Sequence, residues 1–187
     1  YLMVRRPSIR FRATDRAAVP VSLPMSCKIE GKKMKIVCMN EHFDKKEIRK
    51  LDPFTIYHLI SSIEAISNSG INEDNLDLNR VGVMIGSGVG GIQTLEEQHG
   101  TYKSRGQRRV SPFFVPRMIA NIAAGNLAIK YGFKGPNQTV ISACASGTDA
   151  IGLASRIIKY GDADVMITGG TEASITGLTI QGFANIK

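Results

Sequence analysis

The sequence predicts an α/β fold with a mostly parallel sheet covered by helices, and three observations support this prediction. Residues 139–143 form an apolar run without polar alternation, which is typical of a strand covered on both faces. A helical pattern of apolar residues follows and stops at Gly161, and residues 163–168 form a second apolar run. A strand, a helix and a strand at this spacing imply a right-handed crossover between parallel strands.

Length and charge narrow the class of protein. The chain has 187 residues, of which 43% are hydrophobic, and this suffices for the core of one domain. Residues 1–50 hold 13 of the 24 Lys and Arg but only 5 of the 16 Asp and Glu. An excess of positive charge that is confined to one segment indicates a docking patch for an acidic partner. Because no RNA-type aromatic motif or zinc-finger spacing accompanies it, no nucleic-acid partner is expected.

The cysteines and the apolar runs bear on the compartment. Cys27, Cys38 and Cys144 form neither an even set nor a C-x-x-C pair, which disfavours a disulfide scaffold and favours a reducing cytoplasm. No run approaches transmembrane length, and arginines interrupt the first 24 residues, so neither a membrane span nor a signal peptide is predicted. No His, Cys and Asp cluster has ligand spacing, and no metal is predicted.

The first confident helix begins at Pro53. Residues 1–24 show no sustained period, and residues 27–39 are compatible with one or two short strands. Asp52 is suited to be an N-cap with Pro53 at the first helical position, and the helix should end at Gly70. Its apolar stripe consists of Ile56, Leu59, Ile60, Ile63 and Ile66.

Residues 80–86 predict a strand that leads into a glycine-rich turn and an amphipathic stretch to His99. Gly86, Gly88 and Gly91 satisfy the G-x-G-x-x-G spacing of dinucleotide-binding folds. Such folds need an acidic residue about twenty positions later to hold the ribose. The chain has basic residues in a predicted loop instead, so nucleotide binding is disfavoured and no cofactor is predicted. These residues are Lys103, Arg105, Arg108 and Arg109.

Two adjacent phenylalanines, Phe113 and Phe114, stand between prolines and by themselves indicate loop anchors to the core. A helix is then predicted from about Met118 to Gly132.

Further along, Cys144 lies where the apolar strand passes into the next helix. Backbone N–H groups at a helix start favour a thiolate and could hold the oxyanion of an acyl intermediate. Most lone cysteines are small buried hydrophobes, however, and this segment alone leaves both interpretations open.

Three motifs together resemble the β-ketoacyl-acyl-carrier-protein synthases, particularly the elongating synthase II type. They are Lys134-Gly-Pro136, Ala143-Cys-Ala-Ser-Gly147 and the stretch YGDADVMITGGTE at residues 160–172. The resemblance covers residues 27–187 and leaves residues 1–24 unmatched, so residues 25–187 are interpreted as a partial N-terminal synthase domain. It implies the N-terminal half of a thiolase-like fold with layered αβαβα architecture.

The resemblance also implies roles for particular residues. Cys144 matches the cysteine that takes the acyl chain from acyl carrier protein as a thioester. Leu95, Phe113 and Phe114 match positions that shape the acyl pocket, and because the phenylalanines match a segment near the dimer interface, a homodimer is expected. Basic positions that dock the acidic carrier protein are matched by Lys46, Arg49, Lys50, Arg108 and Arg109.

The function that this resemblance implies is fatty-acid elongation by decarboxylative Claisen condensation of an acyl-enzyme thioester with malonyl-carrier protein. Two histidines and a lysine from the family's C-terminal half are needed for condensation, and none is matched by His42, His58 or His99. Residues 1–187 therefore carry the acyl-accepting half and are expected to be inactive alone. A polyketide ketosynthase fragment and a non-catalytic remnant of a split or decayed gene are the alternatives.

Overall fold

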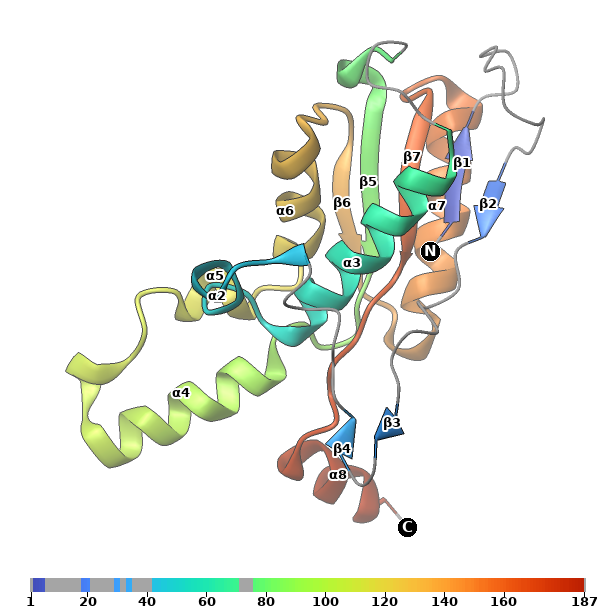
Figure 1. The fold of residues 1–187 in the computed structure, drawn as a ribbon. Coiled ribbons are helices and arrows are strands. Elements are labelled where there is room, and N and C mark those ends of the chain that lie inside the picture. Colours follow the sequence, from blue (N-terminus) through green and yellow to red (C-terminus); the bar gives the residue numbers. More distant parts are fainter. Residues whose placement is uncertain are drawn as a thin grey trace.

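The computed structural model describes residues 2–5, 18–20, 29–30, 33–34, 42–70 and 76–186. The five strands of the central sheet are ordered β2-β1-β7-β5-β6 (Figure 1). They are β1 (Leu2–Arg5), β2 (Ala18–Pro20), β5 (Val81–Gly86), β6 (Asn137–Val140) and β7 (Val165–Gly170). The two strands predicted to be parallel, β6 and β7, each run parallel to β5, which lies between them. β1 is antiparallel to both β7 and β2, so the N-terminal strands make the sheet mixed.

Short elements and helices complete the fold. β3 (Ile29–Glu30) and β4 (Lys33–Met34) form a separate antiparallel pair, which accounts for the extended pattern of residues 27–39. The α-helices are α2 (Lys45–Ile48), α3 (Pro53–Asn68), α4 (Ile92–Arg105), α5 (Phe114–Met118), α6 (Ile122–Tyr131), α7 (Ser146–Tyr160) and α8 (Gly177–Ala184). The 3-10 turns are Leu78–Arg80, Gln107–Arg109 and Ala143–Ala145. Cys27 and Cys38 lie outside the described residues.

The sheet carries a hydrophobic core on each face. Alternate residues of β5 point in opposite directions, so that Val83 and Ile85 pack with α3 and α6, whereas Met84 packs with α7. α3 and α6 lie on the same side of the sheet in Figure 1, and α7 lies on the other. Burial of each such side chain stabilises the fold by about 1.5–3 kcal/mol. The layered α/β arrangement follows from this two-sided burial.

α3 begins as predicted, and its cap also holds a second helix. One carboxylate oxygen of Asp52 accepts a hydrogen bond from the N–H of Phe54 at 3.2 Å. The other accepts from the N–H and the hydroxyl of Thr94, at 3.0 and 2.6 Å. Because Thr94 lies in the first turn of α4, the fully buried Asp52 joins the starts of two helices.

The structure corrects three expectations about local structure. The helix predicted from Met118 to Gly132 begins only at Ile122, as α6. Met118 is instead the last residue of α5, and its carbonyl accepts the N–H of Gly91 at 3.0 Å rather than continuing a helix. α4 extends to Arg105, so part of the predicted basic loop is helical. The strand predicted for residues 139–143 ends at Val140 and is exposed or half-buried, since β6 pairs only with β5 among the described strands.

No helix within the described ranges is long and apolar enough to cross a bilayer.

Candidate active site

The carboxyl ends of the three parallel strands meet at one edge of the sheet, and the start of α7 packs directly against them. A Cβ atom on Gly86 would lie 2.2 Å from the carbonyl carbon of Ser146. A Cβ on Gly170 would lie 3.0 Å from the Cα of Gly147. Only glycine permits this close approach, which brings the turn before α7 to the edge where ligands bind in open α/β sheets.

Cys144 lies in that turn, the 3-10 segment Ala143–Ala145 that leads into α7. Ala143 has a φ of +52°, a left-handed conformation that costs a residue with a side chain about 1–2 kcal/mol. The hydroxyl of Ser146 stabilises the turn by donating to the carbonyl of Ala143 at 2.7 Å and accepting the N–H of Ser142 at 2.9 Å. The hydroxyl of Ser142 in turn donates to Asp149.

This turn presents Cys144 to solvent. The alternative that Cys144 is a small buried hydrophobe is therefore wrong. The N–H groups of Ala145 and Ser146 donate to the carbonyls of Ser142 and Ala143 within the turn, so these two groups are not free to bind an oxyanion. Because Cys144 lies in the turn that directly precedes α7, it is still close to the positive end of the α7 dipole.

Cys144 lines a cavity of about 600 Å³. Four segments form its walls: the turn after β5, the Cys144 turn, the end of β7 and the helix α8. Its lining residues are Gly86, Ser87, Gly88, Val89, Ala143, Cys144, Ser146, Gly147, Gly170, Thr171, Glu172, Ser174, Thr179 and Phe183. The cavity is large enough for part of an acyl chain, and among the described residues that line it there is neither a histidine nor a lysine.

The turn after β5 has none of the free N–H groups that a dinucleotide would need at its tip. The N–H groups of Gly88 and Val89 both donate to one carboxylate oxygen of Glu172, at 2.7 and 3.1 Å. A pyrophosphate would have to displace this carboxylate from the turn. The geometry thus argues against the nucleotide-binding alternative on grounds independent of the missing acidic residue.

The five cations expected to dock a carrier protein are exposed and lie in two segments. Lys46 lies in α2, which Asp44 and Glu47 close with a capping box, and Arg49 and Lys50 follow it. Arg108 and Arg109 lie in the 3-10 turn beyond α4. In Figure 1, α2 and the far end of α4 project from the same side of the sheet. Their roles in docking stay a prediction.

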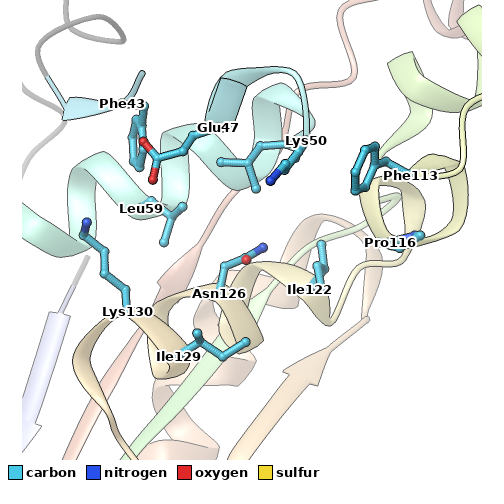
Figure 2. Close-up of a pocket in the computed structure, with 11 residues that line it drawn as sticks. Phe43, Glu47, Lys50, Leu59, Phe113, Pro116, Ile122, Asn126, Ile129 and Lys130 are labelled. Carbon is cyan, nitrogen blue, oxygen red and sulfur yellow. The ribbon is translucent and has the colours of Figure 1, made fainter. Parts of the chain in front are cut away.

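Phe113 lines a second cavity, of about 410 Å³, between α2, α3, α5 and α6 (Figure 2). The ammonium group of Lys50 lies 5.8 Å from the ring centroid of Phe113, and that of Lys130 lies 5.8 Å from the ring centroid of Phe43. These cation–π contacts hold the α2 segment over α5 and α6. Neither Phe113, Phe114 nor Leu95 lines the cavity of Cys144. The resemblance puts the phenylalanines at a partner's pocket, so their substrate role stays a prediction.

The described histidines do not reach Cys144. His42 and His99 are exposed, whereas His58 is fully buried in α3, with its Nδ1 3.2 Å from the hydroxyl of Ser62. Burial lowers the pKa of His58 to about 3, against a smaller rise from its hydrogen bond with the backbone of Ala123. His58 is therefore neutral and structural. No group of three or more potential metal ligands occurs within the described ranges.

Sequence reasoning did not find Glu172 or the second role of Asp52. Glu172 is separated from a predicted strand by Gly169, Gly170 and Thr171, and Asp52 has the ordinary signature of an N-cap. Each carboxylate binds N–H groups that are distant in sequence, and periodicity carries no information about such contacts.

Comparison with known proteins agrees with this arrangement. The chain matches the model of the beta-ketoacyl synthase N-terminal domain over residues 3–187. It is 45% identical over 161 residues to 3-oxoacyl-[acyl-carrier-protein] synthase 2 of Staphylococcus aureus (strain N315), covering 86% of this chain and 39% of that protein. It is 44% identical over 147 residues to the 3-oxoacyl-[acyl-carrier-protein] synthase 2 of Vibrio cholerae, covering 79% of this chain and 36% of that protein. The chain thus spans less than half the length of these curated relatives.

Solved structures share the fold. A type II polyketide ketosynthase bound to a hexaketide and in complex with its acyl-carrier protein gives a TM-score of 0.74 at 27% identity, covering 78% of this chain and 42% of that one. A beta-ketoacyl synthase from Burkholderia phymatum STM815 gives a TM-score of 0.63 at 22% identity, covering 97% of this chain and 42% of that one. These likenesses confirm the thiolase-like α/β fold.

The family match begins at residue 3 and so reaches further toward the N-terminus than the resemblance from residue 27. The domain division near residue 25 stays a prediction. With its whole length from residue 3 onward matched, the chain belongs to the beta-ketoacyl synthase family.

Proposed function

We propose that Cys144 is the acyl-accepting nucleophile of a synthase that elongates fatty acids by decarboxylative Claisen condensation. One observation carries the proposal: Cys144 stands exposed on a strained turn at the start of α7, inside a cavity at the carboxyl ends of parallel strands. A thiolate in this place can attack an acyl thioester, so that a carbon–sulfur bond forms to Cys144 while the carbon–sulfur bond to the carrier breaks and the carrier leaves as a thiolate. The acyl chain then lies in the cavity.

The second half-reaction needs groups that do not line this cavity. Loss of CO2 from a malonyl thioester leaves an enolate, whose carbon attacks the acyl thioester and releases the thiolate of Cys144. The developing negative charge needs positively charged or hydrogen-bond-donating side chains close to the reacting atoms. Since no His or Lys occurs among the described lining residues, we assign this step to residues outside 1–187.

The proposed partner is an acidic acyl carrier protein that docks on Lys46, Arg49 and Lys50, with Arg108 and Arg109 contributing. The exposed positions of these cations support an electrostatic encounter. We also propose a homodimer, which the exposed apolar residues Ile129 and Ile141, 81% and 64% accessible, support as a surface covered in an assembly. A free, exposed cysteine fits a reducing cytoplasm as the compartment.

A polyketide ketosynthase is the second candidate, because one structural relative with a TM-score of 0.74 comes from a polyketide system. The two candidates differ in product. Full-length protein given acyl-carrier and malonyl-carrier protein should yield a single β-ketoacyl product two carbons longer, detected by mass spectrometry. A ladder of successive unreduced extensions would favour the polyketide candidate, and the absence of any condensation by full-length protein would favour the non-catalytic remnant.

A further inference from the structure

The turn after β5, residues 87–91, is fixed by a complete set of backbone hydrogen bonds; we call it the glycine turn. Three of its N–H groups donate to neutral acceptors: Ser87 to the carbonyl of Val140, Gly90 to the hydroxyl of Ser87, and Gly91 to the carbonyl of Met118. The other two, of Gly88 and Val89, donate to the same oxygen of Glu172. Glu172 is thus the only charged acceptor for these N–H groups.

The glycine turn lies close both to Glu172 and to the strained turn that carries Cys144. Ser87, Gly88 and Val89 line the cavity of Cys144. A Cβ atom on Gly88 would lie 3.0 Å from the carboxylate of Glu172 and 3.7 Å from the carbonyl oxygen of Ala143. A shift of the glycine turn by about 1 Å would therefore change the space beside Cys144.

Other contacts hold the strands at this edge without Glu172. The N–H of Thr171 donates to the carbonyl of Gly86 at 2.9 Å, which continues the pairing of β7 with β5. The hydroxyl of Thr171 donates to the carbonyl of Phe54 at 2.7 Å, which fixes β7 to α3. Glu172 itself is exposed, and an exposed charge contributes little to global stability. Its loss should release the glycine turn and leave the sheet intact.

We propose that Glu172 is a positioning residue whose carboxylate, through the N–H groups of Gly88 and Val89, fixes the cavity wall beside an acyl chain on Cys144. This rests on the proposed function in one respect, that Cys144 carries an acyl chain. Consecutive N–H groups of this kind form an anion-binding concavity. Removal of the side chain should therefore leave two unpaired donors that a small carboxylate from solution can occupy.

The test compares two alkylating probes on Cys144 in the full-length protein, iodoacetamide and N-dodecyl iodoacetamide, with the rate measured by peptide mass mapping. E172A should slow labelling by the dodecyl probe about tenfold, because a small misplacement is costly for a chain that must fit the wall. Labelling by iodoacetamide should stay within about twofold, since it needs only an exposed thiol. D162A is the control, because Asp162 is an exposed carboxylate in the turn after α7 and outside the cavity lining, and it should leave both rates unchanged.

Two further readouts separate positioning from a merely structural role. Formate should restore dodecyl labelling of E172A by filling the vacated N–H groups, whereas chloride at the same ionic strength should not. E172Q keeps an uncharged acceptor and should retain most of the wild-type rate.

Equal slowing with both probes, failure of formate to restore the rate, or an E172A protein that does not fold would each overturn the role of Glu172. A wild-type Cys144 that reacts with neither probe would instead overturn the proposed function itself.

Discussion

Acidification should destabilise the protein through His58, whose burial depresses its pKa. The folded state binds the proton only below about pH 3, whereas the unfolded chain binds it below about pH 6.5. The unfolded state therefore carries more protons between these values, so the stability that His58 contributes is complete above about pH 6.5 and falls as the pH drops toward 3. The linkage relation gives a loss of about 2 kcal/mol between pH 7 and pH 5 from this residue alone.

Urea unfolding of the full-length protein at pH 7 and pH 5 measures this loss. H58Q lacks the titrating group, so the difference in unfolding free energy between the two pH values should shrink by about 2 kcal/mol relative to wild type. H99Q removes an exposed histidine as a control and should behave as wild type. Equal pH dependence of wild type and H58Q would refute the assignment of His58 as a buried neutral group.

Three further predictions concern the site and its partners. D52A should lower the unfolding free energy by about 3–5 kcal/mol in urea titrations, because it leaves the buried donors of Phe54 and Thr94 unpaired. A loss under about 1 kcal/mol would contradict the role of Asp52 as the cap of both α3 and α4. Charge reversal of Lys46, Arg49 and Lys50 should slow association with acyl carrier protein in stopped-flow measurements, with a loss that shrinks as salt rises. K159E, which alters an exposed cation on α7, should leave association unchanged. Wild-type association of the triple variant at low salt would place docking elsewhere. Residues 1–187 alone should give no β-ketoacyl product and should sediment as oligomers or precipitate, so a monodisperse monomer that makes product would refute the division of chemistry.

Local chemistry made much of the fold predictable. Asp52 and Pro53 define the start of α3, and the apolar runs around residues 140 and 165 locate β6 and β7, because capping and strand burial depend on neighbours in sequence. The break between α5 and α6 was not predictable, because it arises from a hydrogen bond between Gly91 and Met118, which are distant in sequence. The same holds for the exposure of Ile141, which depends on the place of β6 at the sheet edge.

The candidate site, like the fold, has features that the sequence predicted and features that it did not. The motif around Cys144 indicated a nucleophile at a helix start, and the structure places that cysteine exposed in a cavity. The left-handed Ala143 gave no sequence signal, because alanine is not a residue that favours positive φ. Glu172 gave none either, since a single acidic residue after a strand is common and its acceptor role depends on the distant Gly88 and Val89.

Transfer of an acyl chain to Cys144 is the central claim, and intact-protein and peptide mass spectrometry of full-length enzyme mixed with acyl-carrier protein tests it most directly. In the absence of malonyl-carrier protein, wild type should gain the mass of one acyl group, located on the peptide that contains Cys144, and C144S should gain none under the same conditions. C27S and C38S serve as controls and should acylate as wild type does. Acylation that persists in C144S, or that maps to Cys27 or Cys38, would contradict the assignment of Cys144 as the nucleophile.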